Sequence, residues 1–99
     1  MPSESFDLAE VRRIVQRGLM GRPAQVYLFG SWARGNPART SDIDVAILPL
    51  APLPEGTLGE IREALEESLV VRHVDLLDLS EAAPEFRERV LREGVLWSG

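Results

Sequence analysis

The amino-acid sequence predicts an α/β fold of the α+β type, in which helices flank one small, mixed β-sheet. Three segments repeat apolar residues every three or four positions, which is the spacing of an amphipathic helix. Three shorter segments are rich in β-branched and aromatic residues or alternate apolar with polar residues, which is typical of strands. The order is αβ(α)βαβα, with one helical turn in brackets and a short strand at the C-terminus. These strands are too few for a dinucleotide-binding sheet.

Chain length limits what such a fold can do. The 99 residues suffice for one domain with a modest core, so we expect a single domain over residues 1–99. A large substrate must then be brought by a partner or by another copy of the chain. No apolar run approaches the roughly 20 residues of a membrane span, and the first residues lack the features of a secretory signal. We therefore expect a cytoplasmic protein without a membrane partner.

Composition excludes several kinds of site. The chain has no Cys, which rules out disulfides, thiolate catalysis and cysteine-ligated zinc. The net charge of -5 argues against direct binding of nucleic acid, which normally needs a basic face. All eleven basic residues are Arg, so the Gly-Lys-Ser/Thr of a P-loop is absent as well.

The first helix is expected over residues 6–20. Asp7 and Glu10 have the spacing of a capping box at its start, and Phe6 is placed to pack against Val11 across the cap. The apolar face of this helix consists of Leu8, Val11, Ile14, Val15 and Leu19.

The first strand is expected over Ala24–Phe29, where β-branched and aromatic residues end at Gly30. One helical turn over residues 31–35 and a loop that opens at Asn36-Pro37 should follow. The second strand is expected over residues 42–48. Side chains alternate along it, so one face carries Asp42, Asp44, Ala46 and Leu48, and the other carries Ile43, Val45 and Ile47.

The rest of the chain should add a helix, a strand, a helix and a short edge strand. Thr57 and Glu60 form a second capping box, which predicts a helix over residues 57–70. The apolar face of that helix consists of Leu58, Ile61, Leu65 and Leu69. A third strand follows over residues 71–79. Ser80 is expected to cap the last helix, which ends at Gly94, before an edge strand over residues 95–97.

Two carboxylates of the second strand suggest a metal site. Asp42 and Asp44 project from the same face with Cα atoms about 7 Å apart. Such neighbours repel each other and are best neutralised by a hard cation such as Mg²⁺. Reactions at phosphorus often use two metal ions roughly 3.5 to 4 Å apart, which usually need a third carboxylate.

The third strand offers two candidates for that carboxylate. Asp78 lies at the end of the strand beside Ser80, where a turn or capping role is natural. Asp75 lies within the apolar run, where we expect it to be buried and where an unpaired charge is costly. We therefore assign the third metal ligand, and the base toward the attacking hydroxyl, to Asp75.

The Gly-Ser pair after the first strand suggests a phosphate site. Gly30 allows close approach of the backbone, and Ser31 presents a hydroxyl and an amide where a helical turn begins. This turn is placed to hold the β- and γ-phosphates of a nucleoside triphosphate. Arg34 and Arg39 flank it and can add positive charge. An EF-hand would need further spaced oxygens and a closing Glu, which the sequence lacks.

Three motifs in this order carry a resemblance to a known family: Gly30-Ser31 with Arg34-Gly35, Ser41-Asp42-Ile43-Asp44, and Val74-Asp75-Leu76. Together they resemble the signature of the minimal nucleotidyltransferases of the DNA polymerase beta superfamily, over nearly the whole chain. The resemblance implies the polymerase-beta-like nucleotidyltransferase core and Mg²⁺-dependent transfer of a nucleoside monophosphate to an acceptor. Small members of this family often act as antitoxins of HEPN-domain proteins, and some adenylylate that partner.

The first hypothesis is therefore an enzyme that transfers AMP from ATP to a hydroxyl group, on a HEPN-type toxin. Two Mg²⁺ ions would be held by Asp42, Asp44 and Asp75. The triphosphate would be held by Gly30, Ser31, Arg34, Arg39 and Ser41. Two alternatives stay open at this point: an antitoxin that neutralises its partner by contact alone, and a sensor that binds the nucleotide without turnover.

Overall fold

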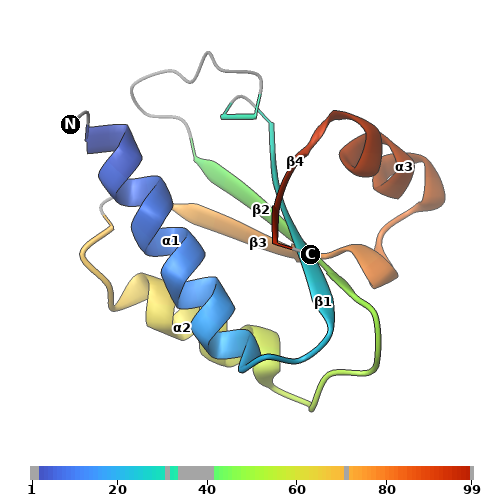
Figure 1. The fold of residues 1–99 in the computed structure, drawn as a ribbon, viewed down its shortest axis with the longest axis horizontal. Helices are drawn as coiled ribbons and strands as arrows, with labels where there is room; N and C mark the ends of the chain where they lie inside the picture. Colours follow the sequence, from blue (N-terminus) through green and yellow to red (C-terminus); the bar gives the residue numbers. More distant parts are fainter. Residues whose placement is uncertain (1–2, 31, 34–41, 71, 99) are drawn as a thin grey trace.

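A four-stranded sheet with the order β3-β2-β1-β4 forms the centre of the computed structural model (Figure 1). The structure describes residues 3–30, 32–33, 42–70 and 72–98. The strands are β1 (Ala24–Phe29), β2 (Ile43–Pro49), β3 (Val74–Asp78) and β4 (Val95–Ser98). β1 pairs antiparallel with β2 and β4, whereas β2 pairs parallel with β3. The mixed sheet expected from the sequence is therefore confirmed.

Helices cover both faces of this sheet. The helices are α1 (Ser3–Leu19), α2 (Thr57–Glu66) and α3 (Pro84–Glu93), with a 3₁₀ turn η1 (Leu79–Glu81) before α3. In Figure 1, α1 and α2 lie along one face and α3 lies on the other. Among the described residues, no helix is both long and apolar enough to cross a membrane.

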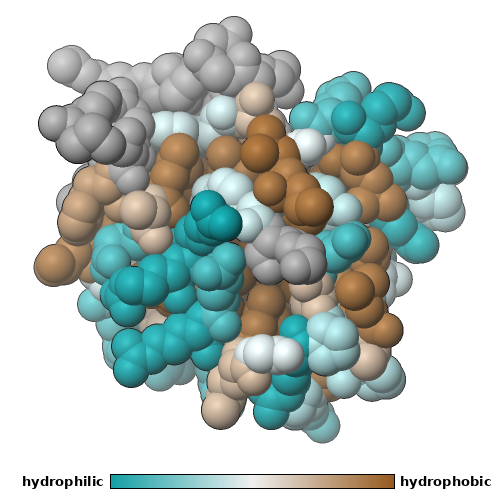
Figure 2. Space-filling view, viewed as in Figure 1, coloured by the Kyte–Doolittle hydropathy of each residue, from teal (hydrophilic) through white to brown (hydrophobic). Residues whose placement is uncertain are grey.

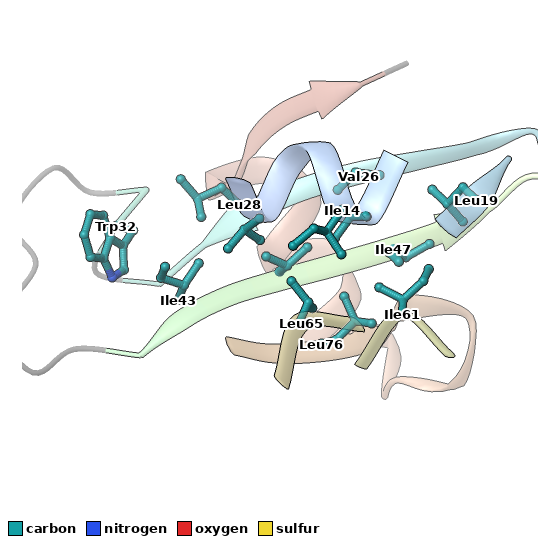
Figure 3. Packing of buried hydrophobic residues seen from close by; sticks show 13 residues of the cluster. Ile14, Leu19, Val26, Leu28, Trp32, Ile43, Ile47, Ile61, Leu65 and Leu76 are labelled. Atoms are coloured by element: carbon teal, nitrogen blue, oxygen red, sulfur yellow. The ribbon is translucent and has the colours of Figure 1, made fainter. Parts of the chain in front are cut away.

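The larger core lies between the sheet and the first two helices. Ile43 and Ile47 of β2 belong to one core cluster with Ile14 of α1 and Ile61 and Leu65 of α2 (Figure 3), and all five side chains are buried. The smaller core joins the opposite face to α3 and contains Tyr27, Ala46, Leu79 and Val90. The two cores confirm the alternation expected along the second strand.

The predicted start of the first helix is wrong. The helix begins at Ser3, so Asp7 lies inside it and is not its cap. Asp7 is buried, and its Oδ2 forms an ion pair with Nε of Arg72 at 3.5 Å. Glu10 pairs with Arg13 on the helix surface, and Phe6 is exposed. Asp7 and Glu10 have the spacing of a capping box, but each carboxylate pairs with an arginine side chain instead.

The second helix also differs from its prediction at both ends. Gly56 in a left-handed conformation precedes it, and Thr57 donates its hydroxyl hydrogen to the carbonyl oxygen of Pro54 at 2.7 Å, so no capping box forms. The helix ends at Glu66 because the amide and hydroxyl of Ser68 both donate to the carbonyl oxygen of Leu65 and close the last turn. Leu69, expected on the apolar face, is 77% exposed.

The C-terminal part follows the expected order with a different cap. Asp78 caps η1 by accepting hydrogen bonds from the amide and hydroxyl of Ser80, which confirms its turn role. α3 starts only at Pro84, so Ser80 does not cap it. The edge strand β4 is confirmed, and Figure 2 shows apolar surface over it, where Val95 and Leu96 are about half exposed.

Candidate active site

The pairing of three strands aligns Asp44 and Asp75 with the end of β1 in one row across the sheet. Phe29, directly before Gly30, pairs with Asp44 of β2, and Asp44 pairs with Asp75 of β3. Neighbouring strands lie about 4.8 Å apart, so these two carboxyl groups belong to adjacent positions. Asp42 lies two residues before Asp44, directly ahead of β2. The end of β1 and the beginnings of β2 and β3 therefore meet at one corner of the sheet.

The row faces the side of the sheet that carries α3. Ala46, two residues along β2 from Asp44, packs in the small core under α3, and alternate side chains of a strand share a face. Asp75 is aligned with Asp44 on a parallel neighbour and projects to the same side. The sequence thus predicted correctly that Asp44 lies on the face opposite to Ile43 and Val45. Asp42 precedes β2, so its place on the same face stays a prediction.

The corner is open to solvent. Asp44 is half-buried, whereas Asp42 and Asp75 are exposed. The expectation that Asp75 is buried is therefore wrong. β3 is one of the two edge strands of the sheet, and Asp75 on this face belongs to neither core. Val74 and Leu76 of the apolar run pack against the large core on one side of β3. Asp75, between them, is on the other side and is exposed.

Gly30 is fitted against Asp44. Its φ of +76° lies in the left-handed region, which side chains other than Gly rarely adopt. A Cβ atom built on Gly30 would overlap the carboxylate oxygen Oδ2 of Asp44. The amide of Ala33 donates to the carbonyl oxygen of Gly30 at 3.1 Å, so a tight turn begins here. The backbone thus approaches the carboxylate at the point where the phosphate turn was predicted.

Four predicted site residues, Ser31, Arg34, Arg39 and Ser41, lie outside the described residues. Their assignment to phosphate binding stays a prediction. Within the described ranges, no group of three or more Asp, Glu or His side chains is gathered into a metal cluster. The donors at the corner nonetheless suit a hard divalent cation, because Asp44 and Asp75 are aligned carboxylates on one face of the sheet.

A contact that the sequence analysis missed fixes the turn after Gly30. The guanidinium of Arg72 lies 5.1 Å from the centre of the Trp32 ring, and the same side chain pairs with Asp7 of α1. Trp32 is buried in the large core. Arg72 therefore joins the turn to α1 through a cation–π contact and an ion pair. In the sequence, this contact is indicated only by Trp32, two residues after Gly30, and by Arg72, shortly before β3. No local pattern connects these two residues.

Replacing Arg72 by Met should lower the stability of the fold by about 2 kcal/mol, because the carboxylate of Asp7 stays buried without this partner. For a chain of this size that corresponds to a fall in melting temperature of about 10 °C. The matched control is Arg13→Met, which removes an ion pair that lies on the surface and should change the melting temperature little. Equal shifts in the two variants, measured by circular dichroism, would contradict this role of Arg72.

Residues 13–97 match the family described as polymerase beta, nucleotidyltransferase. The chain belongs to this family. The resemblance noted in the sequence and the fold class inferred from it are therefore confirmed, and the chain carries a nucleotidyltransferase domain. The corner of Asp42, Asp44 and Asp75 is consequently the candidate active site of a nucleotidyltransferase.

Two proteins with similar sequences carry related names. A protein of Haemophilus influenzae, named probable protein adenylyltransferase MntA, is 35% identical over 85 residues, which are 86% of this chain and 73% of that protein. The protein adenylyltransferase MntA of Shewanella oneidensis is 37% identical over 73 residues, which are 73% of this chain and 52% of that protein. The chain thus spans about three quarters of one relative and about half of the other.

A solved structure shares the fold. It is the crystal structure of a toxin-antitoxin with AMP-PNP, in which the matching chain is 30% identical, with a TM-score of 0.70. The match covers 89% of this chain and 73% of that chain. A nucleotidyltransferase fold of this kind therefore occurs in a complex between a toxin and an antitoxin.

Proposed function

We propose that this chain transfers AMP from ATP to an acceptor hydroxyl on a toxin of the HEPN class and acts as its antitoxin. The strand register that aligns Asp44 with Asp75 carries this proposal, because it brings two carboxylates together beside the Gly30 turn. The names of the two relatives, both protein adenylyltransferases, support AMP as the group transferred. The toxin-antitoxin structure with AMP-PNP supports both an adenine nucleotide and a toxin partner. We propose that the reaction takes place in the cytoplasm, where ATP is available as the donor.

Asp42, Asp44 and Asp75 would hold the Mg²⁺ ions. Two such ions would neutralise the phosphates and activate the attacking oxygen. Gly30 and Ser31 would hold the triphosphate by backbone amides and a hydroxyl, with Arg34, Arg39 and Ser41 adding charge and hydrogen bonds. Gly30 lacks a side chain, so this turn can come close to the carboxylates without displacing Asp44.

We propose that Asp75 acts as the general base toward the acceptor hydroxyl. Its exposure at the edge strand lets a hydroxyl of a separate protein reach it. In the proposed step the acceptor oxygen bonds to the α-phosphorus while the bond from that phosphorus to the bridging oxygen breaks, and pyrophosphate leaves. Asp75 takes the proton of the hydroxyl or orients it for attack. A buried carboxylate could not serve a macromolecular acceptor in this way.

Incubation with a partner tests the proposal. The chain is mixed with ATP labelled on the α-phosphate, Mg²⁺ and a purified HEPN-domain protein encoded next to it. We expect the partner to acquire the label, and we expect EDTA to prevent this. A partner that stays unlabelled, although the two proteins bind each other, would contradict the transfer reaction.

A triple variant distinguishes neutralisation by AMP transfer from neutralisation by contact alone. It carries Asp42→Asn, Asp44→Asn and Asp75→Asn. These substitutions keep the size of the side chains and remove the charges that metal ions need. If transfer is the means of neutralisation, cells that express the toxin should no longer be protected by this variant. Full protection would favour contact alone.

A further inference from the structure

A small cavity adjoins the candidate active site. It has a volume of about 190 Å³ and lies between the end of β1 and one side of α3. Its wall is formed by Phe29, Phe86 and Val90, its edge toward the site by Gly30, and its rim by Arg89 and Glu93. Gly30 also contacts Asp44, so a molecule in this cavity lies next to the carboxylates. None of the proposed catalytic or phosphate contacts uses it beyond Gly30.

The wall of the cavity suits a flat ring. The rings of Phe29 and Phe86 meet edge to face, with centres 5.8 Å apart and planes at 83°, which fixes both side chains. Pockets for whole drug-sized ligands usually measure about 300 to 1,000 Å³, so this one takes a single ring system rather than a complete nucleotide. An apolar wall with few polar groups is the usual form of a ligand site.

Two charged side chains at the rim are available to such a ring. Arg89 and Glu93 are one helical turn apart on α3 and therefore point to the same side. Arg89 has no ion pair or hydrogen bond within the described part of the chain. Glu93 pairs there with Arg92 at 3.9 Å, and both side chains are more than half exposed, so this contact is weak.

We propose that this cavity binds the base of the nucleotide donor and that Glu93 selects adenine by its exocyclic amine. A carboxylate only accepts hydrogen bonds, so it favours an amine donor at this point and disfavours the keto oxygen that inosine carries there. Arg89 stacks its guanidinium on the face of the base. The inference rests on the proposed nucleotidyl transfer, and it adds the residues that choose the base.

Calorimetry with three ligands tests the assignment. ATP, inosine triphosphate and tripolyphosphate are titrated, each with Mg²⁺, into the original chain and the variants Glu93→Ala, Arg89→Ala and Glu88→Ala. The original should bind ATP about tenfold more tightly than inosine triphosphate, the ratio expected from one hydrogen bond to a charged group. Glu93→Ala should bring this ratio close to one. Arg89→Ala should weaken the binding of both nucleotides by the same factor. Neither Glu93→Ala nor Arg89→Ala should change the affinity for tripolyphosphate.

Glu88→Ala is the matched control, because Glu88 is an exposed residue of α3 that does not line the cavity. It should retain the original ratio. A preference for ATP that persists in Glu93→Ala, or an original chain without any preference, would overturn the base site and leave the transfer reaction standing. An original chain that binds neither ATP nor tripolyphosphate would overturn the proposed function, and the base site with it.

Discussion

Replacing Asp44 by Asn should lower nucleotide transfer at least about a hundredfold, since even the loss of a residue that only supports a metal ligand costs about 10- to 100-fold. Asp44 is central to the candidate site, because it is aligned with Asp75, follows Asp42 by two residues and contacts Gly30. Asn has the same shape but no charge, so the strand and its neighbours keep their packing. The measurement is transfer of labelled AMP to the partner, together with the melting temperature of the variant.

Asp78→Asn is the matched control for this variant. Asp78 lies on β3 like Asp75, but its carboxylate caps the turn at Ser80. Asn caps such turns as well as Asp does, so this variant should keep both the fold and most of the activity. Equal activity of Asp44→Asn and Asp78→Asn would show that Asp44 takes no part in the reaction.

Local patterns were sufficient to predict the strands and the face of the sheet that carries the site. β1 has the predicted bounds, β2 is shifted by one residue, and β3 is shorter, Val74–Asp78 against the predicted residues 71–79. The alternation along β2 correctly predicted that Asp44 lies on the face opposite to the large core, because a strand presents alternate residues to opposite faces whatever its neighbours are. The order of elements, including β4, also followed from periodicity. These features depend on residues close together in the sequence.

Features that depend on distant residues were missed or mistaken. Asp7 and Glu10 have the spacing of a capping box, yet Asp7 pairs with Arg72 near β3, which no local pattern indicates. The exposure of Asp75 depends on the place of β3 at the edge of the sheet, and strand order is decided by the whole fold. The cavity beside Gly30 likewise exists only because α3 returns across the sheet to Phe29. The partner of Asp7, the exposure of Asp75 and the cavity all depend on the tertiary structure.

Replacing Gly30 by Ala should impair both stability and transfer. An Ala in the left-handed conformation costs about 1 to 2 kcal/mol, and the new methyl group would also overlap the carboxylate of Asp44. We therefore expect a fall in melting temperature of more than about 5 to 10 °C. Transfer should fall at least about tenfold, because a small displacement of a reacting group is costly.

Gly21→Ala separates the two causes. Gly21 has nearly the same φ, +77° against +76° for Gly30, but a Cβ atom there would meet no other atom within 4 Å. The cost of the backbone conformation is therefore common to both variants, and only Gly30→Ala moves Asp44. Gly21→Ala should lose stability by about 1 to 2 kcal/mol and keep its transfer activity. If instead both variants lose the same stability and keep the same activity, the contact between Gly30 and Asp44 has no part in holding the carboxylate, and the turn would act through its phosphate contacts alone.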